Sequence, residues 1–263
     1  MVRMPSVGRR RGAAAALALA AVLLVGAAGD VRGAENVGVV ATAKNKVTGT
    51  LAKKVRPLKT RSDVFRDEMV ETFAAASAQL LFLDETTMTL GPNSQVVLDE
   101  MVYDPRSGAG SVALSVVRGA ARFVTGIQDP KIYVIRTPTS NIGVRGTALG
   151  IIVGAAGQTI VILLEGVAIV RDLLGRAQVL DQVGTYTVVG ANNTPPSPPA
   201  PAPPTLLNQM DNTQSLGDVV DSLFQLPQDS LPLDLQDFVT QEQQPAGGTT
   251  PPPNKNNYNI DND

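Results

Sequence analysis

Short runs of apolar residues, separated by turn-forming residues, fill the chain between residues 36 and 190. In residues 111–116 (SVALSV), Val112, Leu114 and Val116 would point to one side of an extended chain and the small residues between them to the other. Gly, Pro, Asn and Asp recur between the runs at intervals of about ten residues, as turns between short strands do. The pattern predicts a mainly β fold, either an antiparallel sandwich or roll or a short-strand solenoid.

One apolar run is longer than the others. Residues 146–164 contain no charged side chain, which is close to the length needed to span a bilayer. Glycines interrupt this run, β-branched residues fill the gaps, and the sequence GAAG at 154–157 separates two segments of strand length. These features favour a β-hairpin over the alternative, a membrane helix with a GxxxG pattern.

The first 33 residues have the pattern of a secretory signal peptide. An arginine-rich start precedes an apolar segment, and small residues follow it, so that cleavage could fall after Gly29 or after Gly33. An uncleaved membrane anchor is the alternative. We therefore expect a periplasmic or secreted bacterial protein with no stable membrane span in its mature chain.

Composition changes after residue 190. Residues 191–205 are so rich in proline that neither a helix nor a strand ladder can form, and we expect an extended linker. Lys255 is the only cation of the sequence beyond residue 190, whereas Asp and Glu are frequent there. The last residues, 241–263, are polar and rich in Pro, Gly and Asn, which predicts a C-terminal tail with little structure.

Residues 206–240 are predicted to be a docking segment. Within it, apolar residues recur with the spacing of one face of a short helix, and Pro227 would end that helix. A helix this short is marginal in water, so it would dock either on its own β-domain or on a partner. A second apolar cluster lies at 231–239. The predicted docking residues are Leu216, Val219, Val220, Leu223 and Phe224.

The sequence contains no Cys and no His, which excludes disulfides, thiol nucleophiles, His-dependent triads and Cys/His zinc sites. It has no phosphate-binding glycine loop and no nucleophile elbow. The pairs Asp84/Glu85 and Asp99/Glu100 are adjacent in predicted strands, so the two side chains of each pair would point to opposite faces. We therefore expect no enzyme activity, no metal and no cofactor.

Several blocks of residues 34–190 together resemble the FecR domain family. They are LLFLDETTMTLGPNSQVVLDEMVYDP (80–105), VRGAARFVTG (117–126), IRTPTSNIGVRGT (135–147) and VILLEGVAIVRDLLGRAQVL (161–180). The block TPTSNIGVRGT is the most specific of them. Glu85 stands where the family commonly has Gly, so the turn there would form without glycine's freedom.

The resemblance implies an exported, non-catalytic interaction or sensing module that binds an envelope protein or ligand. The best-known members of the family control a sigma factor through a cytoplasmic portion. Only about a dozen residues precede the apolar segment of this chain, so our expectation stops at the exported β-domain. A structural envelope component that self-associates through its β-domain is the alternative. Nucleic acid is not an expected partner, and the oligomeric state stays open.

The motif residues are expected to act mainly in the structure of the domain. Arg145 stands between two glycines within an apolar segment, so it would either pair with buried carboxylate or carbonyl groups or be presented to an anionic ligand. Thr137 and Pro138 would end the preceding strand, and Thr147 would return a hydroxyl hydrogen bond to that turn. The motif set is Thr137, Pro138, Gly143, Arg145, Gly146 and Thr147.

Overall fold

The computed structural model describes residues 34–103, 110–127, 133–191, 194–211 and 231–243. The predicted signal peptide (1–33), the five predicted docking residues between Leu216 and Phe224, and residues 244–263 of the predicted tail lie outside these ranges. The two helices in the described ranges are both too short and too polar to cross a bilayer.

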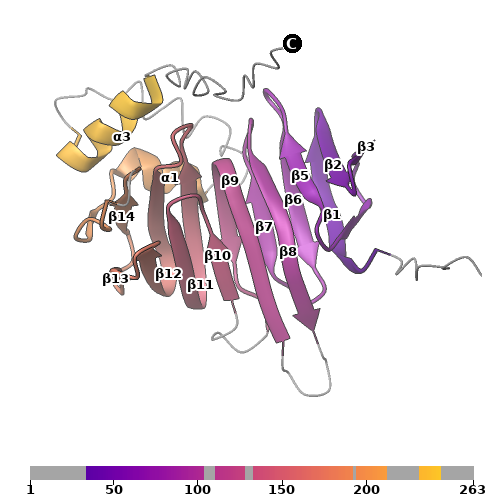
Figure 1. Ribbon diagram of the computed structural model, residues 1–263, viewed down its shortest axis with the longest axis horizontal. Coiled ribbons are helices and arrows are strands. Elements are labelled where there is room, and N and C mark those ends of the chain that lie inside the picture. Colours follow the sequence, from indigo (N-terminus) through magenta and orange to yellow (C-terminus); the bar gives the residue numbers. More distant parts are fainter. Residues whose placement is uncertain (1–33, 104–109, 128–132, 192–193, 212–230, 244–263) are drawn as a thin grey trace, which may run out of the picture. The chain divides into compact units, whose positions relative to one another are not determined.

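The described chain is mostly β, which confirms the predicted fold class (Figure 1). The first seven strands are β1 (Asn36–Lys44), β2 (Val47–Leu51), β3 (Lys54–Pro57), β4 (Asp63–Phe65), β5 (Met69–Thr72), β6 (Ser77–Phe82) and β7 (Thr87–Leu90). The others are β8 (Gln95–Tyr103), β9 (Gly110–Val124), β10 (Tyr133–Arg136), β11 (Ser140–Val153), β12 (Thr159–Asp172), β13 (Ala177–Leu180), β14 (Thr185–Val189) and β15 (Ala200–Pro201). The helices are α1 (Pro204–Asp211) and α3 (Leu233–Gln243).

All these strands belong to one sheet that branches at β9. The first part of β9 pairs with β8 and β10, whereas its last part pairs with β7 and β11. One branch continues from β7 through β6 and β1 to β4, and the other from β8 through β5 and β2 to β3. The β9–β10 pair is parallel, which departs from the antiparallel arrangement that the sequence predicted.

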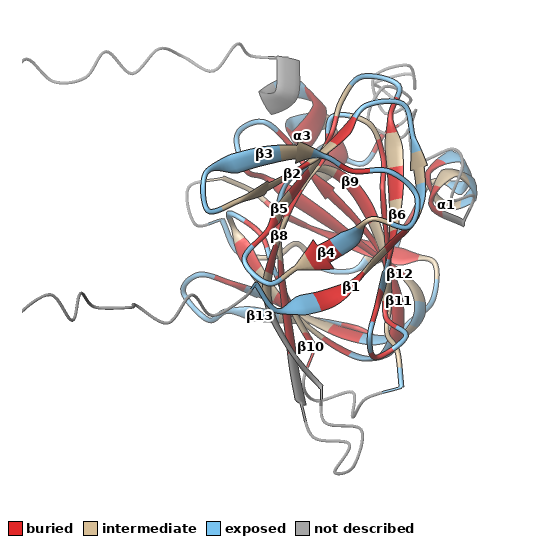
Figure 2. Ribbon diagram, turned by 90° about the vertical axis from the view of Figure 1, so that its right-hand side faces the viewer, coloured by how far each residue is buried: buried red, intermediate tan, exposed pale blue. Residues whose placement is uncertain are grey.

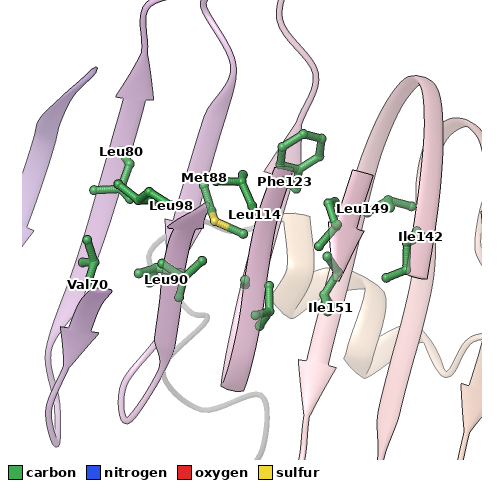
Figure 3. Close-up of a cluster of buried hydrophobic side chains, with 14 of the residues drawn as sticks. Val70, Leu80, Met88, Leu90, Leu98, Leu114, Phe123, Ile142, Leu149 and Ile151 are labelled. Atoms are coloured by element: carbon green, nitrogen blue, oxygen red, sulfur yellow. The ribbon is translucent and has the colours of Figure 1, made fainter. Parts of the chain in front are cut away.

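The main core lies between the two branches. Leu80 from one branch and Leu98 from the other belong to the same buried cluster, together with Leu114 and Phe123 of β9 (Figure 3). Along β5 and β6, buried residues alternate with more exposed ones, whereas the outermost strand β3 has no buried residue (Figure 2). Alternation is the pattern of a sheet with one face in the core. The branched sheet therefore folds over itself as a roll does.

The long apolar run forms the antiparallel hairpin of β11 and β12, which confirms the predicted hairpin. The turn lies at residues 154–158, where the amide of Gly157 donates to the carbonyl of Gly154. Leu149 and Leu163 point into the main core, whereas Ile152 and Ile160 point into a second cluster on the opposite face. The run carries no charged residue because this end of the hairpin is buried on both faces.

The second cluster forms beneath α1 and α3. Leu206 and Met210 of α1, and Leu235 and Phe238 of α3, pack on the outer side of β11, β12 and β14, beside which the helices lie in Figure 1. The proline-rich segment 191–205, in which we expected no strand ladder and no helix, does pair through β15 with β14, contains the start of α1 at Pro204, and buries Ala202 in the same cluster. These C-terminal elements cover the second apolar face of the hairpin.

Candidate functional site

The motif residues at 145–147 form an irregularity in the middle of β11. The pairing of β11 with β12 shifts between Arg145 and Ala148, as at a β-bulge. The Thr147 hydroxyl accepts a hydrogen bond from the Arg145 amide at 2.9 Å and donates one to the Val167 carbonyl at 2.8 Å. Thr147 thus holds the bulge in shape and joins it to β12, rather than bonding to the turn at Thr137 as the sequence had suggested.

Two glycines with positive φ meet at this irregularity. Gly146 in β11 has a φ of 56°, and Gly166 in β12 has a φ of 77°. Before the bulge, Ile142 and Val144 face the main core, whereas after it Leu149 does. The core-facing positions of β11 therefore change from even to odd numbers, which is the effect of one inserted residue.

The bulge lies where β11 changes neighbours. Residues 141–143 pair with β10, whereas residues 148–153 pair directly with β9. The outer face of the sheet changes at the same place. Beyond the bulge, α1 and α3 cover it, but the outward residues before the bulge are only half-buried or exposed. The motif thus separates a covered half of the outer face from an uncovered half.

Thr137 organises the turn between β10 and β11. Its hydroxyl accepts hydrogen bonds from the Ser140 amide at 3.0 Å and the Thr159 hydroxyl at 2.9 Å. Its amide donates to the Ser140 carbonyl at 2.8 Å. Pro138 follows at the exposed tip of the turn, just after β10 ends at Arg136. The strand therefore ends at Thr137 and Pro138, as the sequence predicted, and the turn is anchored to the start of β12.

The uncovered half of the outer face carries an apolar row that runs across four strands. Val134 pairs with Gly143, Gly143 with Ile169, and Ile169 with Val179, so these four residues point to the same side. The row is half-exposed, and Val179 reaches 44% exposure. We call this row and the residues that flank it the open face: Val134, Arg136, Asn141, Gly143, Arg145, Val167, Ile169, Arg171 and Val179.

Because Gly143 has no side chain, the surface of the open face is lower at its centre than around it. A Cβ added at this position would meet no atom within 4 Å. Its neighbours across the strands, Val134 and Ile169, have branched side chains, so the row has a depression in its middle. Because the motif glycine lies in open space, a side chain there would be tolerated by the fold and would fill the depression.

Arginines flank the apolar row on both sides. Arg136 and Arg171 lie in the next same-face positions along β10 and β12, and Arg145 lies in the corresponding position on the other side of Gly143. Arg136 pairs with Asp99 at 3.5 Å. Arg145 and Arg171 are exposed and form no ion pair with the residues that the structure describes. The open face therefore carries an excess of positive charge.

The acidic pair Asp84/Glu85, which we expected in a strand, lies in the turn between β6 and β7, and its Asp84 is a buried carboxylate. Asp84 accepts hydrogen bonds from the Thr86 amide at 3.0 Å, the Thr86 hydroxyl at 2.7 Å and the Tyr133 hydroxyl at 2.8 Å. Gly126 lies so close that a Cβ there would be 2.0 Å from the Asp84 carbonyl oxygen. Next to it, Glu85 is exposed with a φ of 66°, so the turn adopts a left-handed residue without glycine.

The function of Asp84 is structural. It joins segments that are distant in sequence, because its side chain accepts the Tyr133 hydroxyl and its carbonyl accepts the Ile127 amide. Adjacent acidic residues gave no sign of this in the sequence, because only the fold brings Tyr133 against the β6–β7 turn. A signal was present in the order Asp84-Glu85-Thr86, since an Asp followed two residues later by Thr is a common side-chain-capped turn.

A second polar group holds α3 on the sheet. Asp234 accepts hydrogen bonds from the Tyr186 hydroxyl at 2.8 Å and the Ser197 hydroxyl at 3.1 Å. Burial and the hydrogen bond to the Asp234 carboxylate both raise the pKa of Tyr186 above its ordinary value. A pocket of about 160 Å³ lies beside this contact and is lined by Ser197, Asp237 and Phe238 among others. The Asp234 carboxylate in this pocket is thus engaged in docking the helix.

The candidate motif residues divide into two groups in space. Thr137 and Pro138 lie at the end of β10, whereas Gly143 and Arg145 lie on the open face and Gly146 and Thr147 form the bulge at its border. The apolar residues and the other arginines of the open face were not foreseen, because they come from separate strands. Within the described residues, no group of three or more Asp and Glu side chains is placed to hold a metal ion.

Residues 68–168 match the family model described as FecR protein. Two crystal structures of a candidate anti-sigma factor from Parabacteroides distasonis ATCC 8503 are also similar to this chain. In each, the identity is 14%, the TM-score is 0.42, and the match covers 54% of this chain and 64% of the other. The chain thus spans less than two thirds of that protein's length. No match was found among curated proteins.

Proposed function

Residues 68–168 of this chain form a FecR domain, and on this premise we propose that the protein is an exported, non-catalytic interaction or sensing module of the bacterial envelope. Its open face binds an envelope protein or another envelope ligand. The domain match supports a regulatory or sensing role, and the signal-peptide pattern of residues 1–33 supports export.

This proposal rests mainly on the observation that the open face is exposed. The strands β11 and β12 are covered by the chain's own helices on one half of the outer face, but Gly143, Ile169 and Val179 on the other half are not. Apolar residues in a contiguous row, bordered by charged ones, are typical of surfaces that bind a partner. The motif most specific to the family supplies the centre of this surface.

The buried polar groups support a non-catalytic role. Asp84 and Glu68 are fully buried carboxylates, and both accept hydrogen bonds from neighbouring groups of the protein. Glu68 pairs with Arg56 at 2.8 Å and accepts the Phe65 amide. Each carboxylate therefore stabilises the fold and is not presented to a substrate.

Self-association through the β-domain is the alternative function. A second copy stacked on the open face would bring Arg145 and Arg171 of both chains into one interface, and neither arginine forms an ion pair with the described residues of its own chain. Like charges at an interface are unfavourable. The charge of the open face thus favours a different partner over a second copy.

The predicted docking residues Leu216, Val219, Val220, Leu223 and Phe224 lie outside the described residues. We keep as a proposal that they form an apolar helical stripe that docks, because their spacing is that of one helix face. Crosslinks placed at Val220 in the full chain would show whether this stripe docks on its own β-domain or on a partner.

The test of the proposed function uses Gly143→Phe. A side chain at this position meets open space, so the variant should fold normally while its ring fills the depression in the open face. The matched control is Val55→Phe, which adds the same ring at an exposed strand position that is not part of the open face. Both proteins would be used to capture ligands from intact envelopes, with thermal unfolding as the check on folding.

We expect the parent chain and Val55→Phe to retain the same specific ligand and Gly143→Phe to lose it. Equal capture by all three proteins would contradict binding through the open face. Turnover of an envelope substrate by the purified domain would contradict the non-catalytic role. Cell fractionation, with the mass of the mature N-terminus, would test export and locate the cleavage site.

A further inference from the structure

We propose that the partner of the open face is an acidic amphipathic helix of another protein. This inference rests on the proposed function, because it specifies what the same surface binds. Three features of the described residues carry it: the precedent of α3 on the neighbouring half of the sheet, the length of the apolar row, and the positions of the arginines.

The first feature is that this sheet already holds an acidic helix on its outer face. In its described side chains α3 has Asp234 and Asp237 but no cation, and it places Leu235, Phe238 and Val239 against the sheet. Its Asp234 carboxylate is satisfied by hydroxyl groups of the β-domain. The outer face of β11, β12 and β14 is therefore suited to helices with an apolar stripe and acidic flanks.

The second feature is the size of the apolar row. Val134, Gly143, Ile169 and Val179 belong to four neighbouring strands, and strands lie about 4.8 Å apart, so the row is about 14 Å long. A helix rises about 1.5 Å per residue, so three turns would cover the row. The depression at Gly143 would take one large apolar side chain of such a helix, as in other helix-in-groove complexes.

The third feature is that positive charge borders the row on both sides. Same-face residues along a strand are about 7 Å apart. Arg136 and Arg171 therefore lie along one side of the row and Arg145 along the other. An amphipathic helix presents polar residues on both flanks of its apolar stripe, so acidic residues there would reach these guanidinium groups. Arginine pairs well with carboxylates because its planar group donates two parallel hydrogen bonds.

Two other possible partners, an anionic lipid surface and a second copy of the chain, match the open face less well. An anionic lipid surface attracts clustered basic residues, but it has no element that matches an apolar row of limited length with a central depression. A second copy of the chain would bring its arginines against those of the first. The combination of apolar row, depression and two-sided positive charge is met by an acidic helix.

The experiment uses the mature full chain and two synthetic peptides of about 14 residues, which is long enough to cover the row. Both peptides carry leucines on one helical face and are stapled to hold the helix. One has Glu and the other Lys at the remaining positions. Fluorescence anisotropy would measure peptide binding to the parent chain and to the variants Arg145→Glu/Arg171→Glu and Gly143→Phe. The control is Lys54→Glu/Lys59→Glu, which changes the net charge by the same amount as the arginine variant but at residues outside the open face.

We expect the Glu peptide to bind the parent and the control, and to bind at least about tenfold more weakly to Arg145→Glu/Arg171→Glu and to Gly143→Phe. The Lys peptide should bind the parent weakly and gain affinity for the charge-reversed variant. Equal binding of both peptides, or no effect of either open-face variant, would overturn the inference. Thermal unfolding of each variant would show that lost binding is not lost folding.

Two further measurements separate the rival partners. If the parent chain binds phosphatidylglycerol vesicles but not the Glu peptide, and Gly143→Phe abolishes the vesicle binding, the partner is a lipid surface and not a helix. If sedimentation shows that the parent chain is a dimer and that Gly143→Phe dissociates it, the partner of the open face is a second copy of the chain and not a helix of another protein. If the Glu peptide fails but Gly143→Phe still abolishes ligand capture from envelopes, this inference fails while the proposed function stands.

Discussion

Gly146 and Gly166 face each other across β11 and β12 so closely that a Cβ on Gly166 would lie 2.0 Å from the carbonyl oxygen of Gly146. Both residues also have positive φ. This contact allows the hairpin to change its core-facing positions at the border between the open and covered halves of the outer face. The motif glycine of one strand is therefore matched by a glycine of the other.

Gly166→Ala should destabilise the domain by roughly 2–4 kcal/mol, because the new methyl group meets a backbone oxygen and the residue has a left-handed φ. Gly143→Ala in the same hairpin is the matched control, since its Cβ meets no atom within 4 Å. Urea unfolding of both variants measures the difference. Similar stabilities for the two would contradict the contact between the strands.

Thr147→Val should cost about 1–2 kcal/mol of unfolding free energy, because it leaves the Arg145 amide and the Val167 carbonyl without their hydrogen-bond partner. Thr147→Ser keeps the hydroxyl and should retain most of the stability. Hydrogen exchange at the Arg145 amide gives a local measurement. It should become faster in the valine variant and stay near the parent rate in the serine variant.

Asp84→Ala should be among the most damaging single substitutions, with a loss of about 3 kcal/mol or more. It removes the acceptor of the Thr86 amide and of the Thr86 and Tyr133 hydroxyls in a buried site. Tyr133→Phe removes one of these bonds and should cost about 1 kcal/mol. Asp181→Ala, at an exposed position, should change stability by less than about 0.5 kcal/mol. Thermal denaturation of the three variants would check this order.

Tyr186 should make the stability of the domain sensitive to alkaline pH. Its pKa is raised above the ordinary value of 10.0 in the folded state, by burial and by the bond to Asp234. Below pH 10 the phenol holds its proton in both states, so the full stability is present. As the pH rises above 10, the unfolded chain loses this proton more readily than the folded chain, and stability falls.

Tyr186→Phe tests this dependence. It should lower stability by about 1 kcal/mol at neutral pH, through loss of the bond to Asp234, and should lose less stability than the parent as the pH rises past 10. Urea unfolding across that range gives the comparison. Parallel pH profiles for the two proteins would show that the Tyr186 phenol does not contribute.

Truncation after Gly190 should expose the second apolar cluster. It removes β15, α1 and α3, which cover Ile152, Ile160 and Ile162. The shortened chain should bind a hydrophobic dye and aggregate, whereas a chain that ends after Gln243 should behave as the full-length protein. Dye fluorescence and light scattering measure both. If the chain ending at Gly190 stays monomeric and cooperative, the C-terminal helices are dispensable for the fold.

Some of the candidate site could be predicted from sequence and some could not. The strand end at Thr137 and Pro138 and a hairpin within residues 146–164 follow from local residue patterns, and the structure has both, although its hairpin extends from Ser140 to Asp172. The partners of Asp84 could not be predicted, because Tyr133 and Gly126 approach it only through the sheet. The open face was missed for the same reason: its residues lie one or two to a strand, and none forms a recognisable run.

The sequence by itself determined the class of fold and the course of its hairpin, because alternation, glycine position and β-branched residues act over a few neighbouring residues. It did not determine which side of each strand would be covered. The segments 148–153 and 160–164 are apolar on both faces because α1 and α3 return to cover the outer one, whereas Gly143 and Arg145, a few residues earlier, stay open. Coverage is decided by packing between segments distant in sequence, and this packing leaves the motif residues Gly143 and Arg145 uncovered on the outer face.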